Sequence, residues 1–175
     1  MFGPCFVTRS RNNVPDQNTT SALVVQTVTT GTNGIPELLA LSDTYTTSLY
    51  PADSCHLDGI EALSRGNVLV VGLFDQGTVA GMGALKSLSD EIRYGEIKRL
   101  FVIDAYRGRG GGRMIMEALE QEARSQQLRS IRLETGIYQP EAIGLYKSLG
   151  YTIRGPYGDY TGDPLSVYME KLLPV

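Results

Sequence analysis

The chain has 175 residues, of which 42% are hydrophobic and 20% charged, and its net charge is -3. A chain of this length buries about 70% of its unfolded surface, so one globular domain is expected. The acidic balance argues against a nucleic-acid binder that depends on a basic surface. No apolar run reaches the ~20 residues that cross a bilayer, so no membrane partner is expected either.

The few cysteine and histidine residues limit the chemistry. Cys5, Cys55 and the single His56 cannot form a disulfide framework or an ordinary Cys/His zinc site, so no metal is expected. Residues 1–20 read as a polar N-terminal tail without the apolar stretch of a secretory signal. The arginines of this tail resemble an organelle transit peptide faintly, but the segment is short and not amphipathic. The expected location is the cytoplasm.

Residues 21–175 are expected to form a single α+β domain. Val- and Thr-rich or alternating segments predict strands, and apolar stripes with a 3.6-residue period predict helices. Pro36 and Pro140 suit the first turns of two helices, and Gly150 suits the end of the second. The predicted strands are 21–29, 68–74, 78–85, 94–103, 130–135, 151–153 and 165–172, and the predicted helices are 35–50, 57–64, one directly after residue 113, and 140–149.

A glycine- and arginine-rich segment, residues 106–113, stands between a predicted strand and a predicted helix. Glycines let backbone amides approach an anion, and a helix N-terminus adds partial positive charge. Arg107, Arg109 and Arg113 add full positive charges. The segment is neither a Walker loop nor a dinucleotide fingerprint, because their further residues do not follow. It predicts a pyrophosphate site, and the alternative is an ordinary surface turn.

Three segments resemble the signatures of the GNAT acetyltransferase superfamily. Arg107-x-x-Gly110-x-Gly112 is similar to its acyl-CoA pyrophosphate loop, and Glu96–Val102 is similar to the preceding strand. Ala142–Tyr151 is similar to a second signature, a tyrosine-bearing helix that ends in Leu-Gly-aromatic. The three occur in the family's order, and the resemblance covers about residues 22–173. It implies a mixed, mostly antiparallel sheet flanked by helices and splayed between the fourth and fifth strands.

The resemblance implies acetyl-CoA as co-substrate, lying between strands 96–103 and 130–135. The backbone of Leu100, Phe101 and Val102 would pair with the pantetheine arm. Gln139 stands where many members have an Asn that contacts the cofactor, and Tyr146 would lie near the sulfur. The residues expected to hold the pyrophosphate are Arg107, Gly108, Arg109, Gly110, Gly111, Gly112 and Arg113.

Acetyl transfer to an amine needs a base, an oxyanion donor and an acid for the leaving thiolate. Glu96 precedes Arg107 by the spacing at which some GNAT members place a general base. The alternative for Glu96 is a salt bridge with a neighbouring cation. The resemblance makes Tyr146 the acid, whereas its place on an apolar stripe is equally that of a packed core residue. The Leu100 amide or a neighbour would stabilise the oxyanion.

Three loop residues, His56, Tyr157 and Tyr160, are candidate contacts for the acceptor, although loop residues of these types are often simply solvated. The segments 50–56 and 155–169 resemble a subgroup of small microbial GNAT proteins, some of which have been linked to indole-acetic-acid pathways. That link does not identify the acceptor.

The expected function is transfer of an acetyl group to a primary amine of a small molecule, by direct attack in a ternary complex. The alternatives are a protein or peptide N-acetyltransferase and a non-catalytic acyl-CoA sensor. A homodimer is a further option, since GNAT proteins often pair through their C-terminal strands.

Overall fold

The computed structural model describes residues 22–90 and 92–174, so the predicted tail 1–20 lies outside the described residues. These residues form a seven-stranded sheet in the order β1-β2-β3-β4-β5-β7-β6. The elements are β1 (Leu23–Val28), α1 (Ile35–Leu49), a 3₁₀ turn (Ala52–Ser54), α2 (Ile60–Leu63), β2 (Val68–Asp75), β3 (Thr78–Ser89), β4 (Arg93–Val102), a 3₁₀ turn (Asp104–Tyr106), α3 (Gly111–Ser125), β5 (Ser130–Gly136), α4 (Pro140–Ser148), β6 (Thr152–Arg154) and β7 (Ser166–Leu172).

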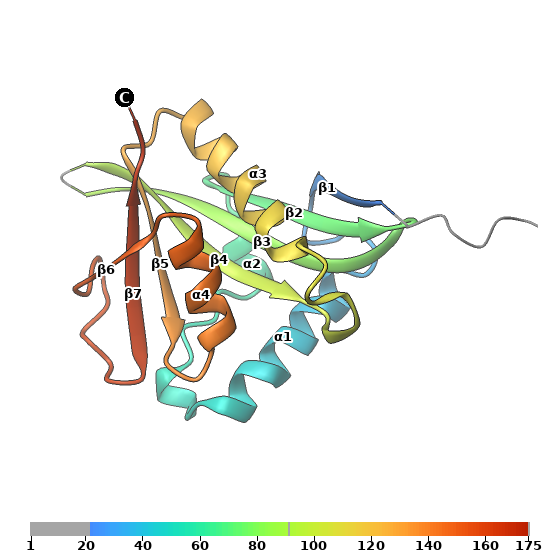
Figure 1. Ribbon diagram of the computed structural model, residues 1–175, viewed down its shortest axis with the longest axis horizontal. Helices are drawn as coiled ribbons and strands as arrows, with labels where there is room; N and C mark the ends of the chain where they lie inside the picture. The colour runs from blue at the N-terminus through green and yellow to red at the C-terminus, as the bar shows by residue number, and fades with distance from the viewer. Residues whose placement is uncertain (1–21, 91, 175) are drawn as a thin grey trace, which may run out of the picture.

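All strand pairs are antiparallel except β4 and β5, which are parallel. The helices cover both faces of the sheet: α3 and α4 lie on one face, and α1 and α2 lie on the other (Figure 1). This arrangement confirms the predicted fold class.

Alternation along the strands builds a core on each face. In β2, Val71 packs into the core that α3 and α4 cover, while Val70 packs into the core beneath α1. Adjacent residues of a strand point to opposite faces, so an apolar run such as Val68–Phe74 predicts a strand buried on both sides. Chain connections then place α1 and α3 on opposite sides of the same sheet.

Three predicted boundaries were wrong. The helix α2 is shorter than the predicted 57–64, because residues 55–59 run beside the sheet instead of coiling. The helix α3 begins at Gly111, so the last residues of the predicted glycine loop form its first turn. Strand β3 extends to Ser89, where it pairs with Arg93 of β4, because the hairpin continues beyond the predicted end at residue 85.

The sheet divides between β4 and β5. These strands pair only from Tyr94↔Ser130 to Ile97↔Leu133, and the rest of β4 pairs with β3 alone. Beyond this point Arg99 has a positive φ of 58°, and the register with β3 shifts, which marks a β-bulge. The two strands therefore diverge as the predicted splay requires, with α4 beside the opening (Figure 1).

A buried carboxylate ties α3 to the C-terminal strand. Glu120 is 3% exposed, and its Oε2 accepts hydrogen bonds from Arg124 at 2.9 Å and Lys171 at 2.7 Å. We expect Glu120→Ala to lower the free energy of unfolding by about 1–2 kcal/mol, because Arg124 and Lys171 lose their shared partner but stay partly exposed to water. Urea unfolding at neutral pH measures this. Glu117→Ala, at an exposed site of the same helix, is the control and should change stability by less than about 0.5 kcal/mol.

Candidate active site

A groove of about 470 Å³ runs from the splayed end of β4 to the first turn of α3. Its lining includes Leu100, Phe101 and Val102, together with the glycines 108 and 110–112. Gly108 and Gly110 have positive φ values of 74° and 81°, which explains glycine at both positions. Gly111 has a different reason, since a Cβ there would overlap the buried side chain of Leu73.

The amino end of α3 suits an anion. Gly110 caps the helix without any side-chain hydrogen bond, so no side chain occupies the first free amides of α3. Two arginines line the same groove. Arg107 donates from Nε to the Val102 carbonyl at 3.0 Å, and Arg113 donates to the Ser148 hydroxyl at 2.7 Å. These residues fit a pyrophosphate, and the apolar wall beside them fits a pantetheine arm.

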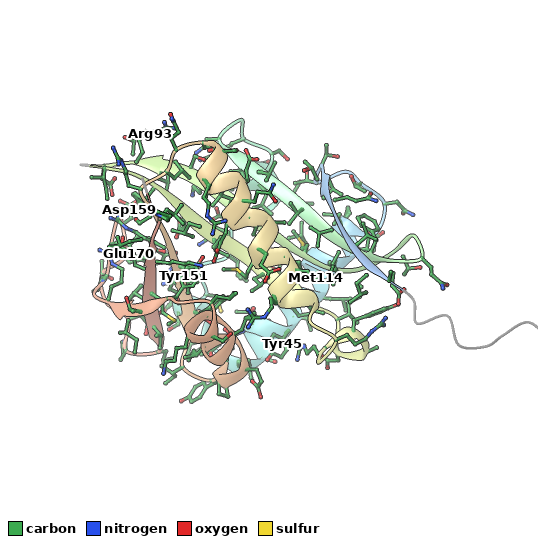
Figure 2. All side chains as sticks on the ribbon, turned by 45° about the horizontal axis from the view of Figure 1, so that its top comes forward. Tyr45, Arg93, Met114, Tyr151, Asp159 and Glu170 are labelled. Atoms are coloured by element: carbon green, nitrogen blue, oxygen red, sulfur yellow. The ribbon has the colours of Figure 1, made fainter. Side chains whose placement is uncertain are left out.

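The third arginine of the segment points elsewhere. Arg109 forms an ion pair with Asp75 at 3.1 Å, at the β2–β3 turn, and is not part of the groove lining. Tyr45 of α1 closes the other side, where the Arg107 guanidinium lies 5.0 Å from its ring centroid. Figure 2 shows Tyr45 beside the loop that leads into α3.

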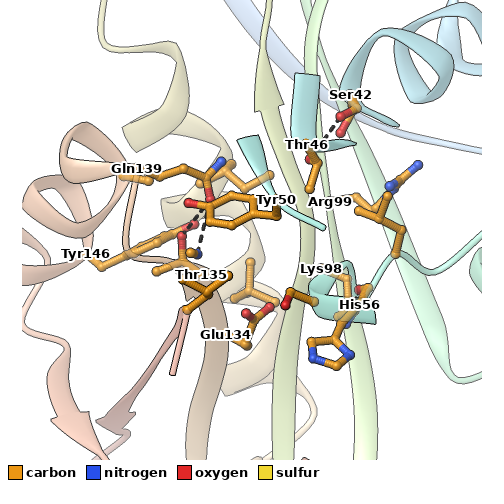
Figure 3. Close-up of a pocket in the computed structure, with 17 residues that line it drawn as sticks. Ser42, Thr46, Tyr50, His56, Lys98, Arg99, Glu134, Thr135, Gln139 and Tyr146 are labelled. Atoms are coloured by element: carbon orange, nitrogen blue, oxygen red, sulfur yellow. Dashed lines mark hydrogen bonds between the residues drawn. The ribbon is translucent and has the colours of Figure 1, made fainter. Parts of the chain in front are cut away.

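A polar cleft continues this groove between the diverging strands (Figure 3). Ile97 and Leu133 are the last paired residues, and both point into the α3 core. The next residues, Lys98 and Glu134, therefore point to the opposite face, toward α1. Glu134, Lys98 and His56 all line the space between the strands (Figure 3).

Glu134 has the electrostatic properties of a general base. Burial raises the pKa of its carboxyl group, while a hydrogen bond from the Ser166 hydroxyl at 2.5 Å and the charges of His56 and Lys98 act in the opposite direction. A carboxylate with an elevated pKa accepts a proton more readily near neutral pH. No other carboxylate lines this cleft among the described residues.

Tyr146 lines the same cleft from α4. Burial, followed by the nearby charge of Glu134, raises the pKa of its hydroxyl, so it remains protonated at neutral pH. Its side chain is 5% exposed and also packs against Tyr151, so the core role and the chemical role coexist. A protonated phenol here is suited to donate to a leaving thiolate.

Glu96 lies in a different cavity. Its Oε1 accepts hydrogen bonds from Tyr157 at 3.1 Å and Tyr160 at 2.7 Å, and Lys98 lies 3.8 Å away. The structure thus brings together three of the predicted site residues, but away from Tyr146. His56 lines both cavities, and its ring meets the edge of Tyr160 at 5.1 Å between centroids.

Gln139 closes the turn between β5 and α4. Its Oε1 accepts hydrogen bonds from the Thr135 hydroxyl at 3.1 Å and the Gly136 amide at 3.2 Å, as Figure 3 shows. Tyr50 reaches the same turn, where its hydroxyl accepts the Tyr138 amide proton at 2.8 Å. A Cβ on Gly136 would overlap the Tyr50 ring, so this glycine lets α1 approach β5 closely. Gln139 and Tyr50 both line the cleft.

Two segments, residues 54–56 and 160–163, meet at the acceptor side of the cleft. His56 contacts Tyr160 across them, and a hydrogen bond from Ser54 lowers the pKa of Asp163. Lys98 links the two segments, because its Nζ donates hydrogen bonds to the His56 carbonyl and the Tyr160 hydroxyl at 3.1 Å each. Residues 54–56 and 160–163 are therefore held together beside the cleft, which Ser54 and His56 line, and the two segments are called the roof below.

In the ranges 22–90 and 92–174 there is no cluster of His, Cys, Asp or Glu arranged to hold a metal ion. Within the same ranges, none of the helices has the length and apolar character that crossing a membrane requires.

Comparison with known proteins agrees with this geometry. Residues 35–151 match the model of the acetyltransferase (GNAT) family. The chain is 41% identical to an IAA acetyltransferase of Azospirillum brasilense over 141 residues, which is 81% of this chain and 92% of the relative. It is 32% identical over 130 residues to the uncharacterized N-acetyltransferase YsnE of Bacillus subtilis, covering 73% and 84% of the two chains.

A solved structure of a candidate acyl-CoA N-acyltransferase from Klebsiella pneumoniae superposes with a TM-score of 0.72. Its sequence identity is 34%, and the match covers 86% of this chain and 97% of that one. The chain belongs to the GNAT family of acetyltransferases and is an acyltransferase enzyme.

Proposed function

We propose that the protein transfers an acetyl group from acetyl-CoA to the primary amine of a small molecule, by direct attack in a ternary complex. The observation that carries this proposal is the placement of Glu134 and Tyr146 in one cleft, where the groove from α3 meets the roofed acceptor side. The contacts between residues 54–56 and 160–163 beside the cleft support a small acceptor over an extended peptide, because a peptide needs an open channel.

The proposed groups act in sequence. Glu134 removes a proton from the acceptor ammonium, and the freed amine attacks the thioester carbonyl. The C–N bond forms, the C–S bond breaks, and Tyr146 protonates the departing sulfur. The nitrogen loses two protons overall: one balances the proton taken up by the thiol, and the other is released to solvent. The backbone beside the Arg99 bulge faces the carbonyl oxygen in this scheme.

The chain's residues also suit the co-substrate. Glycine amides at the start of α3, with Arg107 and Arg113, would hold the pyrophosphate, and β4 residues 100–102 would hold the pantetheine arm. Acetyl-CoA supplies the activated acetyl thioester. Covalent transfer through Cys55 is disfavoured, because burial raises the pKa of its thiol and so reduces the thiolate fraction.

The test is thiol release from acetyl-CoA in the presence of primary amines, with mass spectrometry of the product. We expect an N-acetylated amine formed in equal amount with free CoA. The matched trimethylammonium compounds, which have no N–H, should release no thiol. Acetyl-CoA binding without transfer to any amine would favour the sensor, and acetylation of peptides alone would favour the protein acetyltransferase.

A further inference from the structure

A second cavity of about 460 Å³ adjoins the reaction cleft and is not used by the chemistry described above. The two spaces share the lining residues His56, Leu57 and Lys98, so they are adjacent at these side chains. In Figure 2, Asp159 at its rim lies far from Met114 in the first turn of α3. The second cavity is therefore separate from the groove for the co-substrate.

Aromatic rings and a buried carboxylate line this cavity. Tyr94, Tyr157 and Tyr160 contribute the rings, and the centroids of the last two lie 5.0 Å apart. Glu96, which is 5% exposed, is fixed among them by the two phenol hydrogen bonds. Burial raises the pKa of both phenols, so they remain donors and Glu96 keeps its place. Ring faces and carboxylates both attract cations, and Arg132 already lies 3.9 Å from the Tyr94 ring centroid and Lys98 5.7 Å from that of Tyr160.

The two adjacent cavities are lined by more carboxylates than lysines. The carboxylates are Asp58, Asp90, Glu96, Glu134 and Asp159, whereas the lysines are Lys86 and Lys98. Lys86 lies 3.3 Å from Asp58, and Lys98 lies 3.8 Å from Glu96, so each lysine already has a carboxylate. Lys98 also donates two hydrogen bonds to the roof, to the His56 carbonyl and the Tyr160 hydroxyl. Asp90 lies 3.9 Å from Arg132, so Glu134 and Asp159 are the lining carboxylates that form no ion pair among the described residues, and the excess charge is negative.

The remaining cation of the cleft does not offset this excess. Arg99 forms an ion pair with Asp43 on α1, and its guanidinium points away from Glu134 and Tyr146 (Figure 3). Its Nε and Nη1 atoms are buried and have no hydrogen-bond partner in the part of the chain that the structure describes. Among the described basic side chains of these linings, Lys86, Lys98 and Arg99 each form an ion pair, and His56 is the fourth.

From this we infer that the acceptor is a dication: one ammonium group lies at Glu134, and a second cationic group lies in the cavity lined by Glu96 and the three tyrosines. The inference rests on the proposed function and narrows its substrate class to diamines and other amines that carry a second positive charge. It disfavours acceptors that carry a carboxylate.

The test compares matched acceptors with the purified full-length protein. The probes are a series of α,ω-diamines, the monoamines of equal length and the ω-amino acids of equal length, all assayed by thiol release at low ionic strength. We expect kcat/KM for the best diamine to exceed that of its monoamine about tenfold or more, and the ω-amino acid to be the poorest. Added salt should reduce the preference.

Two variants test where the second positive charge of the acceptor binds. Asp159→Asn, at an exposed rim position, should lower the ratio of diamine to monoamine kcat/KM about threefold. Glu96→Gln should lower it about tenfold, mainly through KM for the diamine. Equal use of diamines and monoamines, or better use of ω-amino acids, arylalkylamines or lysine peptides, would overturn the inference while leaving amine acetylation intact. Failure with every amine would count against the proposed function instead.

Discussion

Glu134→Gln is expected to lower kcat by about 100- to 10,000-fold, because the amide keeps the shape of the side chain but cannot accept the ammonium proton. Steady-state thiol release with a saturating amine measures this loss. Binding of acetyl-CoA, followed by its effect on the melting temperature, should remain close to that of the parent protein. That second measurement separates a lost base from a collapsed site.

Glu96→Gln is the matched comparison, because both residues are carboxylates of the inner strands that point to the same face. Glu96 lines the second cavity with Tyr157 and Tyr160, so its loss should act on acceptor affinity more than on kcat. The opposite result, with kcat lost in Glu96→Gln and retained in Glu134→Gln, would assign the base to Glu96.

The pH profile gives an independent check on Glu134. A base must be deprotonated, so kcat/KM should fall as the pH drops through its raised pKa. The groups that face Glu134 are Ser166 on β7, Lys98 and Glu96 on β4, His56 on the roof and Tyr146 on α4. Ser166→Ala removes a hydrogen bond that lowers the pKa, so the acid limb should move to higher pH. An unmoved limb would exclude Glu134 as the titrating group.

The sequence indicates the residues of the groove more directly than those of the acceptor side, because the groove comes from neighbouring segments of the chain. The glycine segment and Tyr146 are recognisable from a loop followed by a helix and from a helical stripe. Glu134 is not among the predicted site residues, because strand 130–135 was assigned from Ile131, Leu133 and Thr135 alone. The available signal was that Glu134 is the only carboxylate of that strand and alternates with its apolar face. That Glu134 and Lys98 line the same cleft depends on the β4–β5 register, which no local pattern contains.

The same dependence on distant parts of the chain explains where the structure places the side chains of Glu96 and Arg109. The spacing from the glycine segment places Glu96 on the predicted strand. It does not show that Tyr157 and Tyr160, which come from a loop far along the chain, donate hydrogen bonds to Glu96. Arg109 looks equivalent to its neighbours in sequence, yet Asp75 of a distant turn pairs with it. Contacts between remote segments decided both placements, whereas the order of strands and helices followed from composition and periodicity.

Tyr146→Phe is expected to lower kcat about 100-fold with little change in acetyl-CoA affinity, because the ring keeps its packing and only the proton donor is lost. Tyr151→Phe is the control. Tyr151 packs against Tyr146 with ring centroids 6.0 Å apart, and it lies outside the cleft lining. The control should retain most of its kcat.

The raised pKa of the Tyr146 hydroxyl sharpens this expectation. A phenol that stays protonated well above neutral pH donates throughout the working range, so the parent enzyme should show no loss of kcat from Tyr146 between about pH 7 and pH 9. If Tyr146→Phe and Tyr151→Phe lost activity equally, packing at the α4 face would explain the effect. A large loss confined to Tyr146→Phe would leave proton donation to the thiolate as the role that the cleft geometry supports.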